Sequence, residues 1–175
     1  TASAAGLPVF SHTVTVEGGK IAAEGGVTAI VHAIQDADAD EELVSLMQEH
    51  NVLYSPTLTV YEPFEHELAE MSKVAAAMVL YRQERSRANM RTFLDAGIRV
   101  ALGTDQGIDN NPFGEADLRE LELMVDFGLT PAEALQAATR NSAAVLKLED
   151  DRGSIEVGKR ADFILVDGRP WDSIS

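Results

Sequence analysis

The sequence lacks cysteine and is poor in cations, and both shortages exclude whole classes of function. Without cysteine the chain has no disulfide scaffold, no thiolate zinc site and no cysteine nucleophile. Its 14 lysine and arginine residues face 29 aspartate and glutamate residues, which gives a formal net charge of −15. Such a surface repels phosphate backbones and anionic lipids, so binding to nucleic acid or to a membrane surface is not expected.

Long apolar runs and the signals of secretion are also missing. No run approaches the roughly 20 apolar residues that a membrane-spanning helix needs. The N-terminal stretch Thr-Ala-Ser-Ala-Ala-Gly-Leu has neither the basic start nor the apolar centre of a signal peptide. We therefore expect a cytoplasmic protein. The chain begins without methionine, which we interpret as the sign of a fragment or a processed product.

The sequence does contain enough apolar residues for one domain with a core, since hydrophobic residues make up 45% of its 175 positions. Short apolar runs alternate with amphipathic stretches that keep a helical period. We predict strands at residues 8–14, 28–33, 52–58 and 99–105. We predict helices at residues 20–24, 41–49, 65–96, 115–127 and 130–146. Glycine pairs bound the first of these helices, and the third is expected to break or bend near its middle.

The pattern changes after Asp151, where two short strands are predicted at residues 153–157 and 161–166. The chain therefore reads as an α/β protein of four strand–helix units followed by a β-rich tail. Such alternation indicates parallel strands with right-handed crossovers. It does not distinguish part of a barrel from an open, doubly wound sheet that serves as a small-ligand binding module. No glycine-rich phosphate loop or dinucleotide fingerprint is present.

Three of the four predicted strands end in a side chain that can bind a metal, namely His12, His32 and Asp105. Parallel strands place their carboxyl ends at one edge, so these side chains can converge. Imidazole and carboxylate ligands together suit zinc and related divalent metals. Taken singly, each residue has a simpler interpretation, as a core histidine or as an aspartate that caps a helix or turn. The repetition at equivalent positions of successive units favours the metal site.

Several motifs follow one another along nearly the whole chain. They are Gly-Leu-Pro-Val-Phe-Ser-His12, Ala-Ile-Val-His32, Tyr-Ser-Pro-Thr-Leu58, Leu-Gly-Thr-Asp105, Gly128-Leu-Thr-Pro-Ala-Glu-Ala-Leu135, Ala138-Thr-Arg-Asn-Ser-Ala143 and Gly153-Ser-Ile-Glu-Val-Gly-Lys-Arg-Ala-Asp162. In order and spacing they resemble the C-terminal portion of the metal-dependent amidohydrolase superfamily. The resemblance is to its imidazolonepropionase-like and Xaa-Pro dipeptidase-like members in particular.

This resemblance implies a (β/α)₈ barrel of the TIM type beside a small β-sandwich. Residues 1–150 would then form the C-terminal half of the barrel, strands 5–8, and residues 151–175 the start of the sandwich segment. A complete barrel needs about 250 residues, and this chain has 175. A half-barrel exposes two strand edges and an apolar interior, so we expect a homo-oligomer.

The resemblance also implies roles for the three strand-end residues. His12 is similar to the metal ligand of the fifth strand. His32 is similar to the sixth-strand histidine, which binds a second metal in binuclear members and acts on the substrate in mononuclear ones. Asp105 is similar to the eighth-strand aspartate, which binds metal and shuttles a proton. The implied cofactor is one or two divalent metal ions, zinc in the first place, in the full-length enzyme.

The implied substrate is a small amide, a cyclic amide or a dipeptide, cut at a C–N bond. Tyr61 either borders the substrate pocket or packs at the start of a helix. Two parts of the family pattern are absent, the first-strand His-x-His and the fourth-strand lysine that bridges two metals. The sequence therefore predicts a fragment of a hydrolase, and it leaves open that this piece folds without assembling a full metal site.

Overall fold

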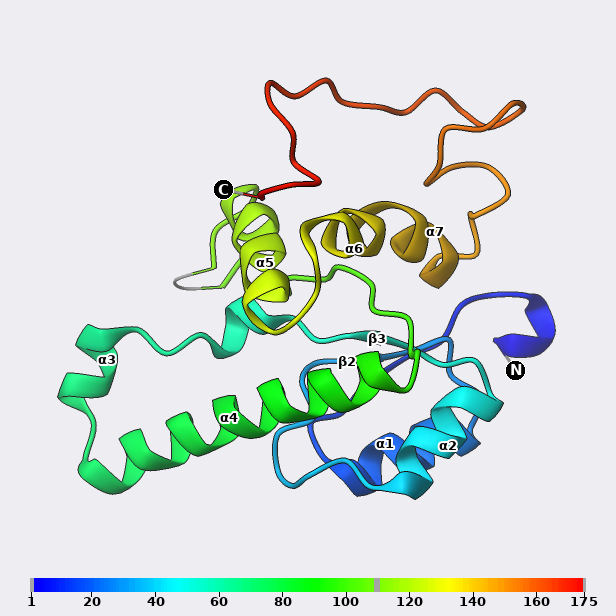
Figure 1. Cartoon of the computed structure of the whole chain (residues 1–175). Helices are drawn as coiled ribbons and strands as arrows, with labels where there is room; N and C mark the ends of the chain where they lie inside the picture. The colour runs from blue at the N-terminus through cyan, green and yellow to red at the C-terminus, as the bar shows by residue number, and fades with distance from the viewer. Residues whose placement is uncertain (1, 109–110, 175) are drawn as a thin grey trace.

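The sheet at the centre of the protein consists of three short parallel strands (Figure 1). The computed structural model describes residues 2–108 and 111–174. The strands are β1 (Phe10–His12), β2 (Ala29–Val31) and β3 (Leu53–Ser55), in the order β1-β2-β3. Each lies inside a predicted strand, and neighbouring strands pair in parallel. The prediction of an α/β protein with parallel strands is confirmed.

The fourth predicted strand, residues 99–105, is reduced to a single bridge. Val100 pairs in parallel with Tyr54 of β3 as an isolated bridge. Two residues later the N–H of Leu102 donates to the carbonyl of Ala137 at 3.1 Å, in the C-terminal helical region. The backbone leaves the sheet at this point, so the prediction of a strand through Asp105 was too long.

Seven α-helices and three short helical turns, of the 3₁₀ or π type, surround the sheet in the part of the chain that the structure describes. The α-helices are α1 (Val16–Glu24), α2 (Glu41–Glu49), α3 (Glu65–Glu70), α4 (Lys73–Asp95), α5 (Glu115–Asp126), α6 (Pro131–Gln136) and α7 (Ser142–Val145). The turns are the 3₁₀ segments η1 (Ser3–Ala5) and η2 (Leu58–Tyr61) and the π-helical η3 (Ala137–Asn141). Among the described helices, none has the length and apolar character needed to cross a membrane.

The helices lie on both sides of the strands. In Figure 1, α1 and α2 lie side by side below the strands, and α5, α6 and α7 lie above them. The predicted helix at residues 65–96 is present as α3 and α4, and its break falls between Glu70 and Lys73, closer to its start than the predicted middle. The predicted helix at residues 130–146 is confirmed as α6, η3 and α7 in succession, and it begins with a capping box of Thr130 and Glu133.

The first helix is longer than predicted because two glycines interpreted as its boundary lie inside it. Thr15 caps α1 by accepting the N–H of Gly18 at 3.1 Å. A Cβ atom placed on Gly19 would lie 3.0 Å from Cδ1 of Leu43, a residue of α2. Gly19 therefore lies at a tight contact between α1 and α2, where a larger residue would displace Leu43, and the interpretation of the glycine pair as a boundary was wrong.

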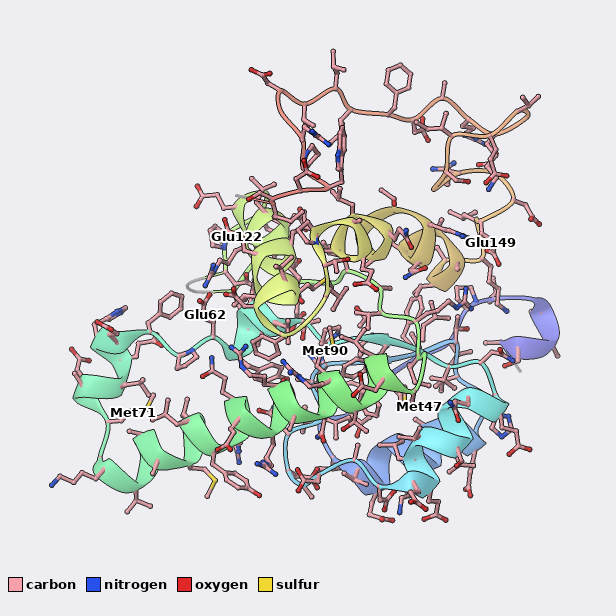
Figure 2. All side chains as sticks on the ribbon, in the orientation of Figure 1. Met47, Glu62, Met71, Met90, Glu122 and Glu149 are labelled. Carbon is pink, nitrogen blue, oxygen red and sulfur yellow. The ribbon has the colours of Figure 1, made fainter. Side chains whose placement is uncertain are left out.

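The core lies between the sheet and the helices. Tyr54 of β3 and Phe93 of α4 are fully buried and pack edge to face, with ring centroids 4.8 Å apart. Met47 of α2 and Met90 of α4, labelled in Figure 2, are also fully buried in this cluster. The long helix α4 is thereby fixed to the same strands that carry the candidate site.

The tail does not form the two strands predicted at residues 153–157 and 161–166. It runs as turns and extended chain, seen in Figure 1 as the orange and red segment without arrows. Ile155 and Leu165 are 99% and 96% exposed, so the apolar side chains that suggested strands find no covering partner among the described residues. A strand needs a neighbouring strand for its backbone hydrogen bonds, and none is present here in the described chain.

Candidate metal centre

The histidine side chains at the ends of β1 and β2 are in direct contact. His12 is the last residue of β1, and His32 directly follows β2. Because the two strands are parallel and paired, the ring centroids lie only 4.2 Å apart, with an interplanar angle of 67°. His12 is exposed, whereas His32 is 7% exposed. The structure thus brings two of the predicted metal ligands together.

Thr57, just beyond β3, holds the ring of His32. The Oγ1 atom of Thr57 lies 2.8 Å from Nδ1 of His32, which leaves Nε2 as the ring nitrogen without a hydrogen bond in the described chain. Burial is the main reason that the pKa of His32 lies below its ordinary value of 6.5, and the neighbouring His12 lowers it further. His32 is therefore neutral at neutral pH, which is the form that binds a metal.

Asp105, the third predicted metal ligand, lies in the loop after the Val100 bridge. Its carboxylate is exposed and acts electrostatically on His32, where it partly offsets the effect of burial on the pKa. Burial raises the pKa of Tyr61, and the charge of Asp105 raises it further. Asp105 is thus in electrostatic range of both side chains. Within residues 2–108 and 111–174, however, no three histidine, aspartate or glutamate side chains form a group that could hold a metal ion.

The backbone at this edge is strained in a way that the sequence did not reveal. Five described residues other than glycine have positive φ, and three of them are His32, Thr57 and Asp105, at 80°, 50° and 50°. Such conformations cost about 1–3 kcal/mol each and concentrate at functional sites. These three residues follow β2, β3 and the Val100 bridge in turn, so strained backbone lies where the candidate metal ligands His32 and Asp105 lie. This coincidence marks the edge as the candidate site.

Gly103 allows two of these segments to approach each other. A Cβ atom at this position would lie 2.3 Å from Oγ of Ser55, the last residue of β3. Gly103 is thus at a close approach between two backbone segments. Only a residue without a side chain lets the Asp105 loop lie against the end of β3.

Tyr61 is the last residue of η2, and its ring is a second aromatic neighbour of His32 beside that of His12. The ring centroids of His32 and Tyr61 are 6.1 Å apart, with an interplanar angle of 85°. The backbone of η2 is held by Glu120 of α5, whose two carboxylate oxygens accept the N–H groups of Leu58 at 2.8 Å and Thr59 at 2.9 Å. Glu120 is fully buried, and burial raises its pKa to about 7. It is 62 residues from Leu58, and no sequence signal linked the two.

The polar loop at residues 106–114 begins beside this edge. Asn111 donates from Nδ2 to the carbonyl of Thr104 at 2.7 Å, and Oγ1 of Thr59 donates to the same carbonyl at 3.1 Å. Both bonds fix the backbone directly before Asp105. Asp109 and Asn110 of this loop lie outside the described residues.

Comparison with known proteins shows which family has this sequence pattern. The sequence profile of the amidohydrolase family matches residues 1–175. The chain belongs to the amidohydrolase family. Imidazolonepropionase of Deinococcus radiodurans is 43% identical to this amidohydrolase over 86 residues, which are 49% of the chain and 21% of that enzyme.

Solved structures match this amidohydrolase over almost its whole length. A Xaa-Pro dipeptidase with methionine bound in its active site is 30% identical, with a TM-score of 0.81 over 99% of this chain and 42% of that one. Ochratoxinase of A. niger is 28% identical, with a TM-score of 0.82 over 99% of this chain and 38% of that one. The amidohydrolase chain therefore spans about two fifths of the length of these structural neighbours.

Proposed function

We propose that this chain is the C-terminal half of a barrel enzyme that hydrolyses a C–N bond in a small amide or dipeptide. One observation carries the proposal: His12 contacts His32, with Asp105 in electrostatic range, at the carboxyl ends of adjoining parallel segments. This arrangement occurs in a chain that matches the amidohydrolase family throughout. Active sites of (β/α)₈ enzymes lie at this end of the strands.

The donor chemistry of this edge fits a divalent metal, with zinc as the first choice. Two imidazoles, one of them held neutral, and one carboxylate are the ligand types that zinc binds. Since no complete cluster occurs in the described residues, His12, His32 and Asp105 would supply part of the ligand set. The remaining ligands would come from the half of the barrel that this chain does not contain. A bound divalent metal lowers the pKa of water toward neutrality and polarises a carbonyl group.

The residues of the chain would have three further roles, in proton transfer, in orienting His32 and in contacting the substrate. Asp105 is exposed and positioned to take a proton from water and pass it to the leaving nitrogen. The hydrogen bond with Thr57 fixes the ring of His32 and leaves its Nε2 for a metal or a substrate. Tyr61 packs on His32 and borders the substrate. The roles of His32 and Asp105 are those that the resemblance to the family implies, and the geometry is compatible with them.

The sheet itself supports a half-barrel for residues 1–150. Within the described residues, β1 pairs with a strand on one side only, and the segment around Val100 pairs with the sheet through a single bridge to Tyr54. A closed barrel pairs every strand on both sides, so two open edges are what half of one would show. Residues 151–175 would then be the start of the accompanying β-sandwich, whose strands form only against segments that this chain does not contain.

Two open edges also predict self-association. Phe10 on β1 is 45% exposed, and unpaired strand edges favour pairing with another chain. We expect light scattering to give the mass of an oligomer, which is two or more times the 18.9 kDa of one chain. A folded, monodisperse species at 18.9 kDa would contradict this expectation.

A second candidate function, a folded piece without catalysis, is favoured by the incomplete cluster among the described residues. It differs from the first in one measurable property, which is the amount of metal that the chain retains. Zinc, manganese and iron per chain should therefore be measured by mass spectrometry after purification in metal-scrubbed buffer. We expect about one metal ion per chain in the wild type and a loss of most of it in Asp105→Ala.

The matched control is Asp150→Ala, which removes an exposed carboxylate from the turn after α7. It should retain the wild-type metal content. Equal metal in Asp105→Ala and the wild type would remove Asp105 from the site. Negligible metal in every variant would overturn the metal site for this chain and leave the non-catalytic alternative.

A further inference from the structure

Thr57 occupies the N-cap position of η2, but its side chain does not cap this turn. The first N–H groups of a helical turn have no partner within it, and an N-cap threonine usually accepts one of them with its side-chain oxygen. Thr57 makes no such bond. Its Oγ1 atom lies 2.8 Å from Nδ1 of His32 instead. The hydroxyl that would ordinarily stabilise η2 is thus used on a residue of the candidate metal centre.

Glu120 of α5 supplies the cap that Thr57 does not. Helix α5 packs on η2 (Figure 1). The two carboxylate oxygens of Glu120 accept the N–H groups of Leu58 and Thr59, which are the first two residues of η2. A carboxylate is costly to bury, and an apolar side chain could fill the same space without that cost. The two hydrogen bonds to η2 are therefore what this position gains from a carboxylate.

The backbone of Thr57 shows what the cap from α5 prevents. An N-cap residue normally has an extended backbone, whereas Thr57 has φ of 50° and ψ of 54°. Without another acceptor for the N–H groups of η2, Thr57 could relax to the extended conformation and turn its Oγ1 atom toward them. Glu120 already binds these N–H groups, so Thr57 stays in its strained conformation with its hydroxyl on His32.

The same turn also contacts the segment that carries Asp105. Thr59, whose N–H is bound by Glu120, donates from Oγ1 to the carbonyl of Thr104 at 3.1 Å. Thr104 directly precedes Asp105, which has φ of 50°. A positive φ at a residue other than glycine persists only where the surroundings hold it. The turn that α5 caps therefore meets both sides of the candidate centre.

We propose that Glu120 is a positioning residue of the candidate metal centre, which caps η2 so that the hydroxyl of Thr57 is left for His32. Thr57 then accepts the hydrogen on Nδ1, so that Nε2 carries the electron pair that a metal needs. Through Thr59, the same carboxylate holds the backbone before Asp105. This inference rests on the proposed function, because that function makes His32 and Asp105 the ligands to be positioned.

The test observes the tautomer of His32 directly, without metal or turnover. Long-range ¹H–¹⁵N NMR spectra of the histidine-labelled chain in EDTA show which ring nitrogen carries the hydrogen, and His32→Gln identifies the His32 signals by their loss. The spectra are recorded at pH 8, above the pKa values of His32 and Glu120. We expect the hydrogen on Nδ1 in the wild type.

In Glu120→Gln, one N–H group of η2 faces an amide NH₂ group instead of an acceptor. The ratio of the Nδ1–H to the Nε2–H tautomer of His32 should then fall about fivefold, as for the loss of one ordinary hydrogen bond. Glu120→Asp, which draws the carboxylate back by one methylene group, should also lower the ratio. Glu122→Gln, an equal change of charge at a partly exposed position of α5, should leave it intact.

Two threonine variants trace the two routes. Thr57→Val removes the hydroxyl at nearly constant shape and should lower the tautomer ratio as Glu120→Gln does. Adding Glu120→Gln to Thr57→Val should lower it no further, because both changes break the same link. Thr59→Val should leave the tautomer of His32 unchanged but shift the backbone amide signal of Asp105, which Glu120→Gln should shift as well.

Four results would overturn the proposal. They are hydrogen on Nε2 or a mixture of tautomers in the wild type, an unchanged ratio in the Glu120 variants, an equal fall in Glu122→Gln, and an Asp105 signal that Glu120→Gln does not shift. An equal fall in Glu122→Gln would mean that any change on α5 loosens the site. The metal measurement with Asp105→Ala is independent of the tautomer, so either proposal can fail while the other stands.

Discussion

Replacing Glu120 with alanine is expected to lower the free energy of unfolding by about 3 kcal/mol. The variant leaves the N–H groups of Leu58 and Thr59 buried without their acceptors, which lie 2.8 Å and 2.9 Å away in the wild type. It also opens a cavity under η2. Chemical denaturation near pH 6 would measure the change.

Glu122→Ala is the matched control, because it lies one half-turn along the same helix with its side chain 41% exposed and paired with Arg119. Surface pairs of this kind contribute about 0–1 kcal/mol, so the control should change stability little. A loss below about 1 kcal/mol in Glu120→Ala would show that η2 does not depend on this carboxylate.

The raised pKa of Glu120 gives the same residue a signature in the dependence of stability on pH. Burial, and to a lesser extent Asp117, raises its pKa from 4.5 to about 7 in the folded protein. Folding therefore favours the protonated form. The resulting stability is fully present below pH 4.5 and is lost as the pH rises through about 7.

Glu120→Gln would isolate this contribution. The difference in stability between wild type and variant should change by about 3 kcal/mol between pH 4 and pH 8. His32, whose pKa is lowered by burial, titrates with the opposite sign but is present in both proteins and cancels. A difference that does not vary with pH would mean that the pKa of Glu120 is the same in the folded and the unfolded protein.

Asn89→Ala is expected to cost a similar amount, about 3 kcal/mol. Asn89 is 1% exposed on α4, and its side chain makes three hydrogen bonds to the loop after β2. Nδ2 donates to the carbonyls of Ile34 and Ala37, both at 2.9 Å, and Oδ1 accepts the N–H of Ala39 at 2.7 Å.

Thermal and chemical denaturation would measure the loss in Asn89→Ala, with Arg91→Ala as the control. Arg91 is exposed on the same helix, and no hydrogen bond from its side chain joins distant parts of the described chain. If both variants lost the same small amount of stability, the loop after β2 would have to be held by its own turns.

The sequence predicted the elements whose signals are local. The apolar run that leads to His32 became β2, because a buried parallel strand requires a continuous apolar run wherever it lies in the fold. The capping box at Thr130 and Glu133 fixed the start of α6, since all of its hydrogen bonds lie within four residues. The assignment to the amidohydrolase family is confirmed, because its motifs extend along the chain.

What the sequence could not predict depends on contacts between distant residues. Glu120 is an ordinary helix acid in the sequence, and only the fold places it under Leu58, 62 positions away. Asn89 likewise contacts a loop 50 or more positions distant. Gly19 was misinterpreted because its role depends on Leu43 of another helix. The role of Thr57 at Nδ1 of His32 was invisible for the same reason.

The strained residues at the carboxyl edge have a consequence for engineering. Asp105 is the exposed one of the three, so glycine there would relieve about 1–2 kcal/mol of backbone strain without emptying a buried site, although the greater freedom of the unfolded chain takes back up to about 1 kcal/mol. A directed-evolution campaign that selected for heat tolerance alone would therefore drift toward glycine at Asp105 and remove the carboxylate of the edge. Thermostable variants should be sought with this position held fixed.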